Sequence, residues 1–439
     1  MPRCVPSVPV LCAGKAAFVR DRGLLSRCMR PVLLIMLVCG LVWGCAPRPE
    51  IVPPAPPVTP EVPPVAKPAE PEEERFVELS AVEALTVVRG LSPAAQGLAS
   101  WRDMAPAVER SLAYARSKPA GDMAIRQGSV TVTWGAVRTT LETLRDLLPR
   151  LDKEPDLLAQ RFRWFKVAKG NSFTGYYEPV LKASRTPKKG YPQPLYAMPP
   201  DLKTLDLGKF RPQLEGQSIV YRIEKGEAVP YHDRAAIDGQ GVLRGKGLEL
   251  AWAADPVEVF ILQVQGSGKL QFEDGSEVHV LYAGQNGRPY VALGRVMRDR
   301  GLQPADGMNM DTMRQWLRAH PERVRELLDT NPSYIFFNIG GDGPNGSMGS
   351  KLTPWVSLAV DRQSLPMGAP VAFAVDIPQQ GGGKKPMQGL GLAQDIGGAI
   401  KNNRIDLFCG KGDRANFVAS RLNAKGQTWL LLVREGLGN

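Results

Sequence analysis

Three aspartates near the C-terminal end of the chain lie among glycines and short apolar runs. Asp395 begins the sequence Asp-Ile-Gly-Gly-Ala-Ile, Asp406 lies within Ile-Asp-Leu-Phe, and Asp361 follows Ala-Val further upstream. A charged side chain is costly in an apolar run unless it is paired or has a chemical role. Glycine lets the backbone come close to a polar ligand, because it carries no side chain. The pattern therefore indicates a site for acid/base chemistry, and a polysaccharide is the substrate class we consider first.

Asp406 is the best candidate for a general acid. Its apolar neighbours would raise the pKa of the carboxyl, and glycosidic cleavage needs an acid whose pKa lies near the working pH. Asp395 lies eleven residues upstream, across a turn at 401–403, and on a hairpin-like return the two carboxyls would face each other. The alternative is that both are surface or turn aspartates. Asp413, in Gly-Asp-Arg, is interpreted as a turn residue.

Three other segments could bind a sugar, although each has a simpler structural interpretation. Two consecutive glycines after Asp395 would admit a sugar to the backbone, or would only form a tight turn. A Tyr-Tyr-Glu segment combines aromatic platforms with an acid, but most tyrosines are packing residues. A Gln-Gly-Ser-Gly run offers an amide and a hydroxyl, as do many turns that end strands. The candidate substrate-binding residues are Tyr177, Glu178, Gln265, Ser267, Gly397 and Gly398.

Composition excludes several classes of function. The formal net charge is +11, but residues 1–44 carry +5 of it, so the remainder is only mildly basic. That charge suits a surface near an anionic polymer or membrane, and nucleic acid is not expected as a partner. Five of the six cysteines lie within residues 1–45 and the three histidines lack metal-ligand spacing, so neither a disulfide framework nor a metal site is expected. Phosphate-binding glycine motifs are absent, and no cofactor is predicted.

The N-terminal segment has the pattern of a secretory signal. Arg30 precedes the apolar run Val32–Val42, which is too short to span a bilayer at about 20 residues and matches the apolar core of a signal peptide. Cys45 follows Gly44, as in the lipobox of bacterial lipoproteins, so residues 1–45 are interpreted as signal peptide and lipobox, with Met29 as an alternative start. The other interpretation is an ordinary signal peptide with an incidental cysteine.

A proline-rich linker follows the lipobox over residues 46–75. This composition cannot build a core and predicts an extended tether of ~3 Å per residue. Ala46 is not the aspartate that retains lipoproteins at the inner membrane, so we expect a lipid anchor in the outer membrane, facing the periplasm. The tether would let the anchored domain reach a polymer away from the bilayer.

The first part of the body is predicted to be helical. Between residues 77 and 165, apolar residues recur at three- and four-residue spacing, which predicts helices over Ala81–Leu91, Ala95–Arg116 and Trp134–Leu151. A second helical pattern, over Met310–Leu317 and Glu322–Leu328, predicts a helix pair within the later part of the chain.

The rest of the body has the texture of a β-rich fold. From about Phe173, short β-type runs separated by glycine predict a barrel or a sandwich, and they continue to the run Thr428–Val433. Runs expected as strands include Ile219–Tyr221, Val257–Val264 and Val278–Tyr282.

Taken in order, the motifs resemble the membrane-bound lytic murein transglycosylase A (MltA) family, from about residue 100 to 435. The C-terminal part resembles the 3D domain, which is named for three aspartates, here Asp361, Asp395 and Asp406. The motifs that carry the resemblance are Gly175-Tyr-Tyr-Glu-Pro179, Val264-Gln-Gly-Ser-Gly268, Tyr282-Ala-Gly-Gln-Asn-Gly287, Asn331-Pro-Ser-Tyr-Ile-Phe-Phe337 and Asp395-Ile-Gly-Gly-Ala-Ile400.

The resemblance implies a mainly β fold with an N-terminal helical segment. A double-psi β-barrel domain would carry a second, inserted smaller β-barrel domain, with the substrate groove between them. The expected boundaries are 76–182 for the helical segment and first part of the barrel, 183–338 for the inserted barrel, and 339–439 for the 3D domain that completes the first barrel.

The resemblance also implies an activity, the non-hydrolytic cleavage of the β-1,4 bond between N-acetylmuramic acid and N-acetylglucosamine in peptidoglycan. Asp406 matches the family's catalytic acid/base and Asp395 and Asp361 match its supporting residues, while the candidate binding residues lie where the family lines its groove. The alternatives are a peptidoglycan hydrolase and a non-catalytic glycan-binding lipoprotein. Glycan strands and a membrane are the expected partners. Cell-wall synthesis proteins are partners that nothing in the sequence excludes or names.

Overall fold

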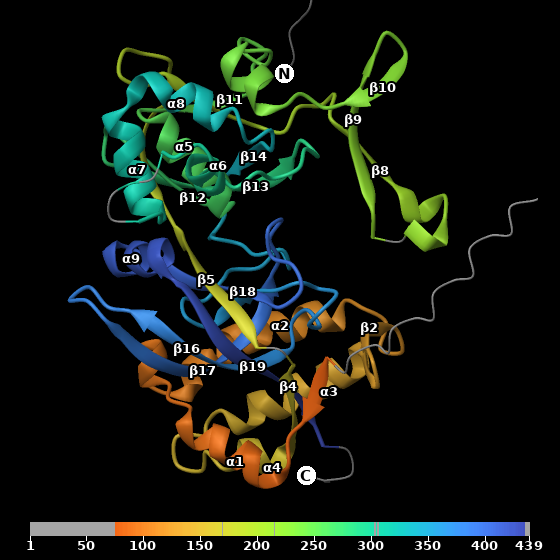
Figure 1. Cartoon of the computed structure of the whole chain (residues 1–439). Coiled ribbons are helices and arrows are strands. Elements are labelled where there is room, and N and C mark those ends of the chain that lie inside the picture. Colours follow the sequence, from red (N-terminus) through yellow and green to blue (C-terminus); the bar gives the residue numbers. More distant parts are fainter. Residues whose placement is uncertain (1–74, 169, 215, 303, 305–306, 435–439) are drawn as a thin grey trace, which may run out of the picture. The chain divides into compact units, whose positions relative to one another are not determined.

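The computed structural model describes residues 75–434, apart from residues 169, 215, 303, 305 and 306 (Figure 1). The predicted signal peptide, Cys45 and residues 46–74 of the proline-rich linker lie outside the described residues. Among the described helices, none is long and apolar enough to cross a membrane.

The helical part forms where predicted, except that the second predicted helix is interrupted and the third ends at Leu147 instead of Leu151. Ser80 caps α1 (Ala81–Gly90), because its hydroxyl accepts from the Glu83 amide and the Glu83 carboxylate accepts from the Ser80 amide, as in a capping box. The helix expected over Ala95–Arg116 is interrupted, because Gly97 adopts a φ of +73° and Ser100 caps a separate short helical turn. The elements of this part are β1 (Phe76–Glu78), α1 (Ala81–Gly90), α2 (Ala105–Arg116), β2 (Met123–Gln127), β3 (Val130–Thr133), α3 (Trp134–Leu147) and α4 (Leu157–Arg161).

Six strands close into the first barrel, which confirms the predicted barrel fold. They follow the order β5-β18-β15-β17-β16-β19, and β19 pairs back with β5 to complete the ring, while β4 and β1 extend the sheet from β19. Pairs β5–β18 and β15–β17 are parallel. The strands are β4 (Phe162–Val167), β5 (Asn171–Glu178), β15 (Ser357–Ala359), β16 (Pro370–Pro378), β17 (Lys384–Asp395), β18 (Arg404–Lys411) and β19 (Asn423–Val433).

A second sheet is inserted between β5 and β15 in the sequence. Its order is β14-β13-β12-β6-β11-β7, and its edge strands β14 and β7 lie near each other, so the sheet curls towards closure. The predicted helix pair is confirmed as α7 and α8. The elements are β6 (Val180–Ser184), β7 (Gln193–Tyr196), β11 (Glu249–Ala253), α5 (Pro256–Gln265), β12 (Gly268–Phe272), β13 (Glu277–Gln285), α6 (Leu293–Asp299), α7 (Met310–Ala319), α8 (Pro321–Leu328) and β14 (Ile335–Ile339).

The strand expected over Val257–Val264 is wrong, because this run forms helix α5. Asp255 caps the helix by accepting a hydrogen bond from the Val257 amide, Pro256 occupies its first turn, and Gly266 ends it with a φ of +82°. The run is apolar on most sides because the helix is buried, and an apolar run of this length does not distinguish a strand from a buried helix.

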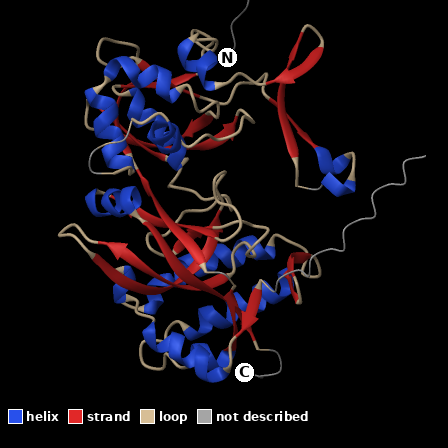
Figure 2. Cartoon of the chain, in the orientation of Figure 1, coloured by secondary structure: helices blue, strands red, loops and turns tan. Residues whose placement is uncertain are grey.

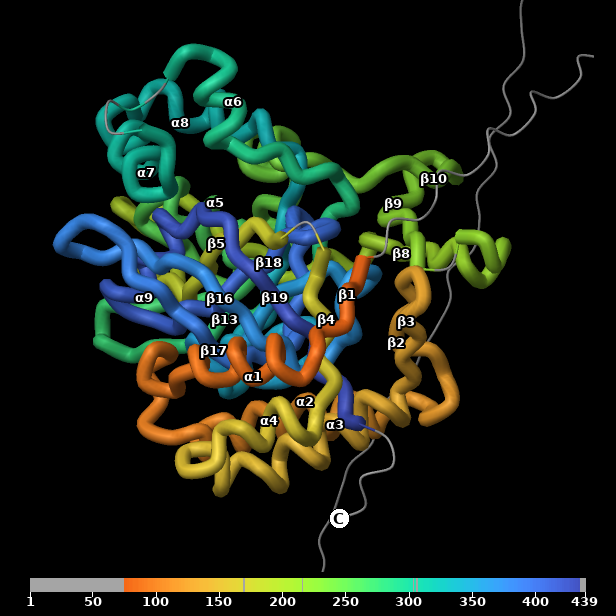
Figure 3. The backbone as a smooth tube through the Cα atoms, turned by 60° about the horizontal axis from the view of Figure 1, so that its bottom comes forward, coloured from red at the N-terminus to blue at the C-terminus, as the bar shows by residue number. Residues whose placement is uncertain are grey.

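Two further elements complete the fold. A three-stranded arm of β8 (Lys203–Asp206), β9 (Ser218–Glu224) and β10 (Glu227–Pro230) forms its own sheet (Figure 2). Helix α9 (Asp413–Arg421) follows β18 directly, and the tube in Figure 3 shows the helix beside the barrel strands. Asp413 is therefore the first residue of a helix and not a turn residue, in a position where a negative charge is favourable.

Candidate active site

Strand register brings Asp395 and Asp406 to the same level of the first barrel. Ala359 on the central strand β15 pairs with Asp395 of β17 on one side and with Asp406 of β18 on the other. Paired positions on neighbouring strands direct their side chains to the same face of a sheet. The expected hairpin-like return is thus wrong in its topology, since β15 lies between the two strands, but both carboxyls lie on one face.

Asp406 lies in an apolar setting on that face. An apolar cluster of Tyr176, Leu352, Ala359, Ile400 and Phe408 is formed by residues of the same strands and neighbouring loops. Burial raises the pKa of the Asp406 carboxyl to about 6, the nearby Asp395 charge adds to the rise, and a Thr174 hydrogen bond and the Arg404 charge oppose it. The side chain keeps partial exposure to solvent. A carboxyl of this kind is protonated in a useful fraction near neutral pH.

Thr174 and Arg404 hold the Asp406 carboxylate. Thr174 pairs with Asp406 across the parallel β5–β18 ladder, and its hydroxyl donates to Asp406 Oδ1 at 2.9 Å. The Arg404 guanidinium donates in turn to Thr174 Oγ1 at 3.2 Å. This chain of donors fixes the direction in which the carboxyl can present a proton.

Asp395 is held by three donors. The Tyr176 hydroxyl donates to Asp395 Oδ2 at 3.0 Å, and the backbone amides of Ser347 and Ile396 donate to Oδ1 at 2.8 and 2.9 Å. Burial raises the pKa of Asp395 to about 6 although all three hydrogen bonds lower it. With most of its lone pairs engaged, Asp395 is suited to supporting its neighbour and less suited to attacking a substrate itself.

Asp361 organises a turn near the site. Its Oδ2 accepts from the Asn402 amide at 2.7 Å and its Oδ1 from the Gln363 amide at 3.0 Å. The carboxylate thereby holds the turn from which β18 departs towards Asp406. The third aspartate is therefore bonded to the backbone of this turn.

The predicted binding residues fall into two groups. Gly397 and Gly398 lie next to the carboxyls, in a tight turn in which Ile400 N donates to Gly397 O at 3.0 Å, and space around Gly398 is open. The others lie where the chain passes from the first barrel to the inserted sheet. These are Tyr177, Glu178, Gln265 and Ser267.

The residues at this junction contact one another. Tyr177 N donates to Gln265 Oε1 at 2.9 Å. Glu178 is buried and its Oε1 lies 2.8 Å from His279 Nδ1, while burial raises the pKa of the Glu178 carboxyl. Ser267 is buried beside Gly268, where a Cβ would lie 2.7 Å from Pro179 O. These side chains fix the crossing between the two parts.

Sequence reasoning missed Thr174, Tyr176 and Arg404 as site residues. Thr174 and Tyr176 alternate along β5 with the buried Phe173 and Tyr177, so a period-two reading of the strand would have placed them on the opposite face. No sequence signal shows that β5 pairs with β18, which is what brings them to Asp406.

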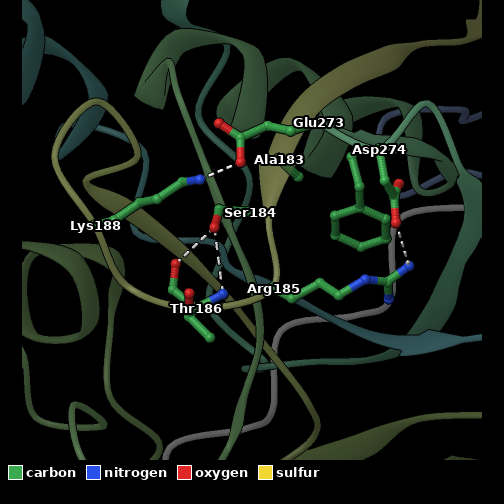
Figure 4. A pocket seen from close by; sticks show the side chains of 8 residues that line it. Ala183, Ser184, Arg185, Thr186, Lys188, Glu273 and Asp274 are labelled. Atoms are coloured by element: carbon green, nitrogen blue, oxygen red, sulfur yellow. Dashed lines mark hydrogen bonds and ion pairs between the residues drawn. The ribbon is translucent and has the colours of Figure 1, made fainter.

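A pocket elsewhere carries no comparable chemistry. It encloses about 400 Å³ beside β6 and β12 and is drawn in Figure 4. Its charged side chains pair with each other, Lys188 with Glu273 and Arg185 with Asp274, and Arg185 also lies 3.9 Å from the centre of the Phe272 ring. All four charged side chains are well exposed, so the pocket has the character of ordinary surface.

Neutralising Asp406 is expected to stabilise the protein at neutral pH. The folded-state pKa of about 6 lies above the ordinary value of 3.8, so charging this carboxyl above pH 6 costs free energy only in the folded state. Asp406→Asn removes that cost and should add about 3 kcal/mol to the free energy of unfolding at pH 7.5. The gain should shrink as the pH falls through 6 towards 4. Urea unfolding of both proteins across this range measures it, and a variant less stable than the parent at pH 7.5 would contradict the burial argument.

Removing the Thr174 hydroxyl is expected to shift the pH profile upwards. The hydroxyl lowers the pKa of Asp406 by bonding to its charged form, so Thr174→Val should raise that pKa and move the alkaline limb of the rate profile to higher pH. The rate of glycan cleavage at pH 5 should change by less than about threefold. Thr143→Val is the control, since that hydroxyl bonds only to the Thr139 carbonyl on α3. An unmoved or lowered limb would show that the hydroxyl does not act on Asp406.

Comparison with known proteins agrees with the site. The family described as the MltA specific insert domain matches residues 172–338, and the 3D domain matches residues 356–432. These matches define a 3D-domain protein that carries the MltA insert.

Individual relatives extend the comparison. A membrane-bound lytic murein transglycosylase A from Vibrio cholerae is 34% identical over 264 residues, which cover 59% of this chain and 64% of that protein, just under two thirds of its length. The crystal structure of a membrane-bound lytic murein transglycosylase from Agrobacterium tumefaciens matches with a TM-score of 0.68 and 30% identity, over 82% of this chain and 98% of that one. Escherichia coli MltA with bound chitohexaose matches at 0.57 and 27% identity, over 75% and 89%. The chain belongs to the membrane-bound lytic murein transglycosylase A family.

Proposed function

We propose that the protein is a peptidoglycan lytic transglycosylase. It cleaves the β-1,4 bond between N-acetylmuramic acid and N-acetylglucosamine and leaves a 1,6-anhydromuramic acid end, in the turnover of the cell wall. The observation that carries the proposal is Asp406, a partly exposed carboxyl with a pKa raised to about 6 and a second carboxyl on the same face. Membership of the family and the chitohexaose bound to the Escherichia coli relative support a β-1,4 glycan as the ligand.

The proposed reaction needs one acid/base residue. Protonated Asp406 gives its proton to the glycosidic oxygen as that bond to the anomeric carbon breaks. The C6 hydroxyl of the same muramic acid then attacks the anomeric carbon and returns its proton to Asp406. Atoms balance without water, and the enzyme regains its starting state.

Intramolecular attack explains why a second free carboxylate is unnecessary. A retaining hydrolase uses a second carboxylate as nucleophile and an inverting hydrolase uses one to activate water. A well-placed internal hydroxyl gains up to ~7–11 kcal/mol over a reactant from solution. Asp395 raises the pKa of Asp406 through its charge, and its three bound donors keep it in place. Asp361 supports the site through the turn at Asn402.

Product analysis tests this function. Sacculi digested by the protein should release fragments that end in anhydromuramic acid, one water lighter in the mass spectrum than the reducing ends of a hydrolase. A non-catalytic binding protein would sediment with sacculi and release nothing. Reducing ends as the main product, or no product, would overturn the proposal.

Ligand-binding and domain assignments accompany the proposal. Tyr177, Glu178, Gln265, Ser267, Gly397 and Gly398 are assigned to the substrate-binding region, the two glycines by direct approach and the others at the crossing between the parts. The proposed domains are 76–182 with 339–439 for the first barrel and 183–338 for the inserted one, and strands β6 and β14 of the inserted sheet each extend across one of these boundaries. Glycan strands of peptidoglycan are the proposed partner, and cell-wall synthesis proteins are potential partners that no observation identifies.

We also propose a lipid anchor at Cys45 in the outer membrane, with the catalytic part facing the periplasm. The relatives' name, membrane-bound, supports membrane association, and the lipobox supports the anchor. Stable anchoring takes more than one acyl chain, and Cys45 is where these chains would be attached. Cys45→Ala should therefore move the protein from the membrane to the soluble fraction. Fractionation with the parent as control measures this, and a variant that still sediments with membranes would contradict the anchor.

A further inference from the structure

Helix α7 of the inserted part is joined to helix α9 of the first barrel by Asp311. Arg421 Nη1 contacts Asp311 Oδ2 and Ser420 Oγ donates to Asp311 Oδ1 at 3.1 Å. The Asp311 and Arg421 side chains are 15% and 32% exposed, so this ion pair is more protected than an ordinary surface pair. The two helices lie next to each other in Figure 1.

Arg314, one turn along α7, makes a second connection. Its Nη2 donates to the Tyr177 hydroxyl at 2.9 Å, and its guanidinium lies 2.9 Å from Asp311 and 2.7 Å from Glu258 of α5. The residue is only 9% exposed. Arg314 thus bonds both to the end of barrel strand β5, through Tyr177, and to the inserted part, through Glu258.

Both connections lead to the strands that carry the site. Gly175 on β5 lies so close to α9 that a Cβ there would be 3.0 Å from Ala419 Cα. β5 holds Thr174 and pairs with β18, which holds Asp406, and α9 follows β18 after Gly412. A shift of α7 relative to α9 would therefore be transmitted to β5 and β18 and would displace the backbone around Asp406.

Most of the remaining contacts of α7 belong to the inserted part, although Met310, its first residue, also packs against the apolar cluster of the first barrel. Met313 and Leu317 pack with Val257, Phe260 and Leu293 in an apolar cluster of that part alone. Loss of the polar contacts would consequently leave this core complete, while Met310 would be left to hold the start of α7 against the first barrel.

We propose that an interdomain latch is formed by Asp311, Arg314, Arg421 and Tyr177. Within it, Asp311 and Arg314 are positioning residues that hold the inserted part in the orientation, relative to the first barrel, in which the glycan binds. This inference rests on the proposed transglycosylase function. The latch touches no reacting atom and acts through Tyr177 and α9.

Kinetics of latch variants test the proposal. Asp311→Asn, Arg421→Gln and the double variant of the full chain are assayed on soluble peptidoglycan glycan strands, and chitohexaose is the binding probe. Each single variant should raise KM and the Kd for chitohexaose about five- to tenfold with kcat within about twofold of the parent, because ground-state and transition-state binding are lost together. The KM and the chitohexaose Kd of the double variant should be no higher than those of the more impaired single variant, because the two residues act as one unit.

Arg300→Gln is the matched control, because its ion pair with Glu326 at 2.6 Å joins elements within the inserted part. Its KM should equal that of the parent. If Asp311→Asn and Arg421→Gln lower the midpoint of thermal unfolding but leave KM and the chitohexaose Kd unchanged, the contacts are only structural and the latch is overturned. Additive effects in the double variant would also overturn it. A parent that releases no anhydro product would instead reject the proposed function.

Arg314 provides an independent variant for the same question. Arg314→Lys keeps the charge near Glu258 but cannot maintain several donors in one plane. Its KM should lie between those of the parent and Arg314→Met. Equal values of KM for Arg314→Met and the parent, with Arg314→Met folded by circular dichroism, would contradict the positioning role.

Discussion

Asp406→Asn should abolish the release of anhydromuropeptides, with kcat lower by about 10²–10⁴-fold, the usual contribution of a positioned acid/base. The asparagine amide can accept the Thr174 hydrogen bond but has no proton to give to the glycosidic oxygen. Binding of chitohexaose should change little, because the loss falls on the chemical step. Release of labelled fragments from sacculi measures the rate, and calorimetry measures the binding.

Asp413→Asn is the matched control for this prediction. It makes the same chemical change seven residues along the chain, at the exposed first position of α9. The control should retain at least half of the parent rate. An Asp406→Asn protein that cleaves at the parent rate would remove Asp406 from the role of acid.

Asp395→Asn should move the alkaline limb of the pH–rate profile to lower pH. After burial, which raises the pKa of Asp406 most, the Asp395 charge is the other influence that raises it. Without that charge Asp406 loses its proton at lower pH, so the protonated fraction at pH 7 falls, and kcat there should drop by roughly tenfold. The rate at pH 5 should fall much less. Rates from pH 4.5 to 8.5 measure the shift.

Asp361→Asn separates this effect from a general loss of charge. Its carboxylate is bonded to the backbone of the 401–403 turn, so its loss should lower the rate at all pH values alike. The roles assigned to the two aspartates would be reversed if the alkaline limb of the pH–rate profile moved in Asp361→Asn and remained in place in Asp395→Asn. Together with Thr174→Val, whose limb should move in the opposite direction, the variants define the local electrostatics of Asp406.

Local features of the sequence led to the proposal of Asp395 and Asp406, and the structure places both beside Ala359 of β15. Asp406 stands out because a charge in Ile-Asp-Leu-Phe has no structural reason, and in the structure burial raises the pKa of its carboxyl to about 6. The barrel fold followed from short apolar runs and the ordered motifs. These features depend on residues close together in the chain.

Features that depend on pairing between distant segments could not be read from the sequence. The insertion of β15 between the strands of Asp395 and Asp406 is decided by the closure of the barrel, so a local hairpin was the natural but wrong expectation. The helix at Val257–Val264 depends on burial of most of its sides, which an apolar run alone cannot show. Thr174 became a site residue only through the β5–β18 ladder.

The contacts of Arg314 and Asp311 at the junction between the two parts could not be predicted from the sequence either. On the sequence they are charged residues of an amphipathic helix, a pattern that usually indicates a solvated face. Their partners Tyr177 and Arg421 lie more than 100 residues away, so the connection between α7 and the first barrel emerges only in three dimensions.

The central claim is that a C6 hydroxyl of the substrate, activated by Asp406 alone, takes the place of water. Digestion of sacculi in heavy-oxygen water tests it most directly. The parent protein should produce anhydromuramic ends that carry no heavy oxygen, and Asp406→Asn should produce almost none in the same time. Muramic acid ends that incorporate heavy oxygen would show attack by water and would contradict the account.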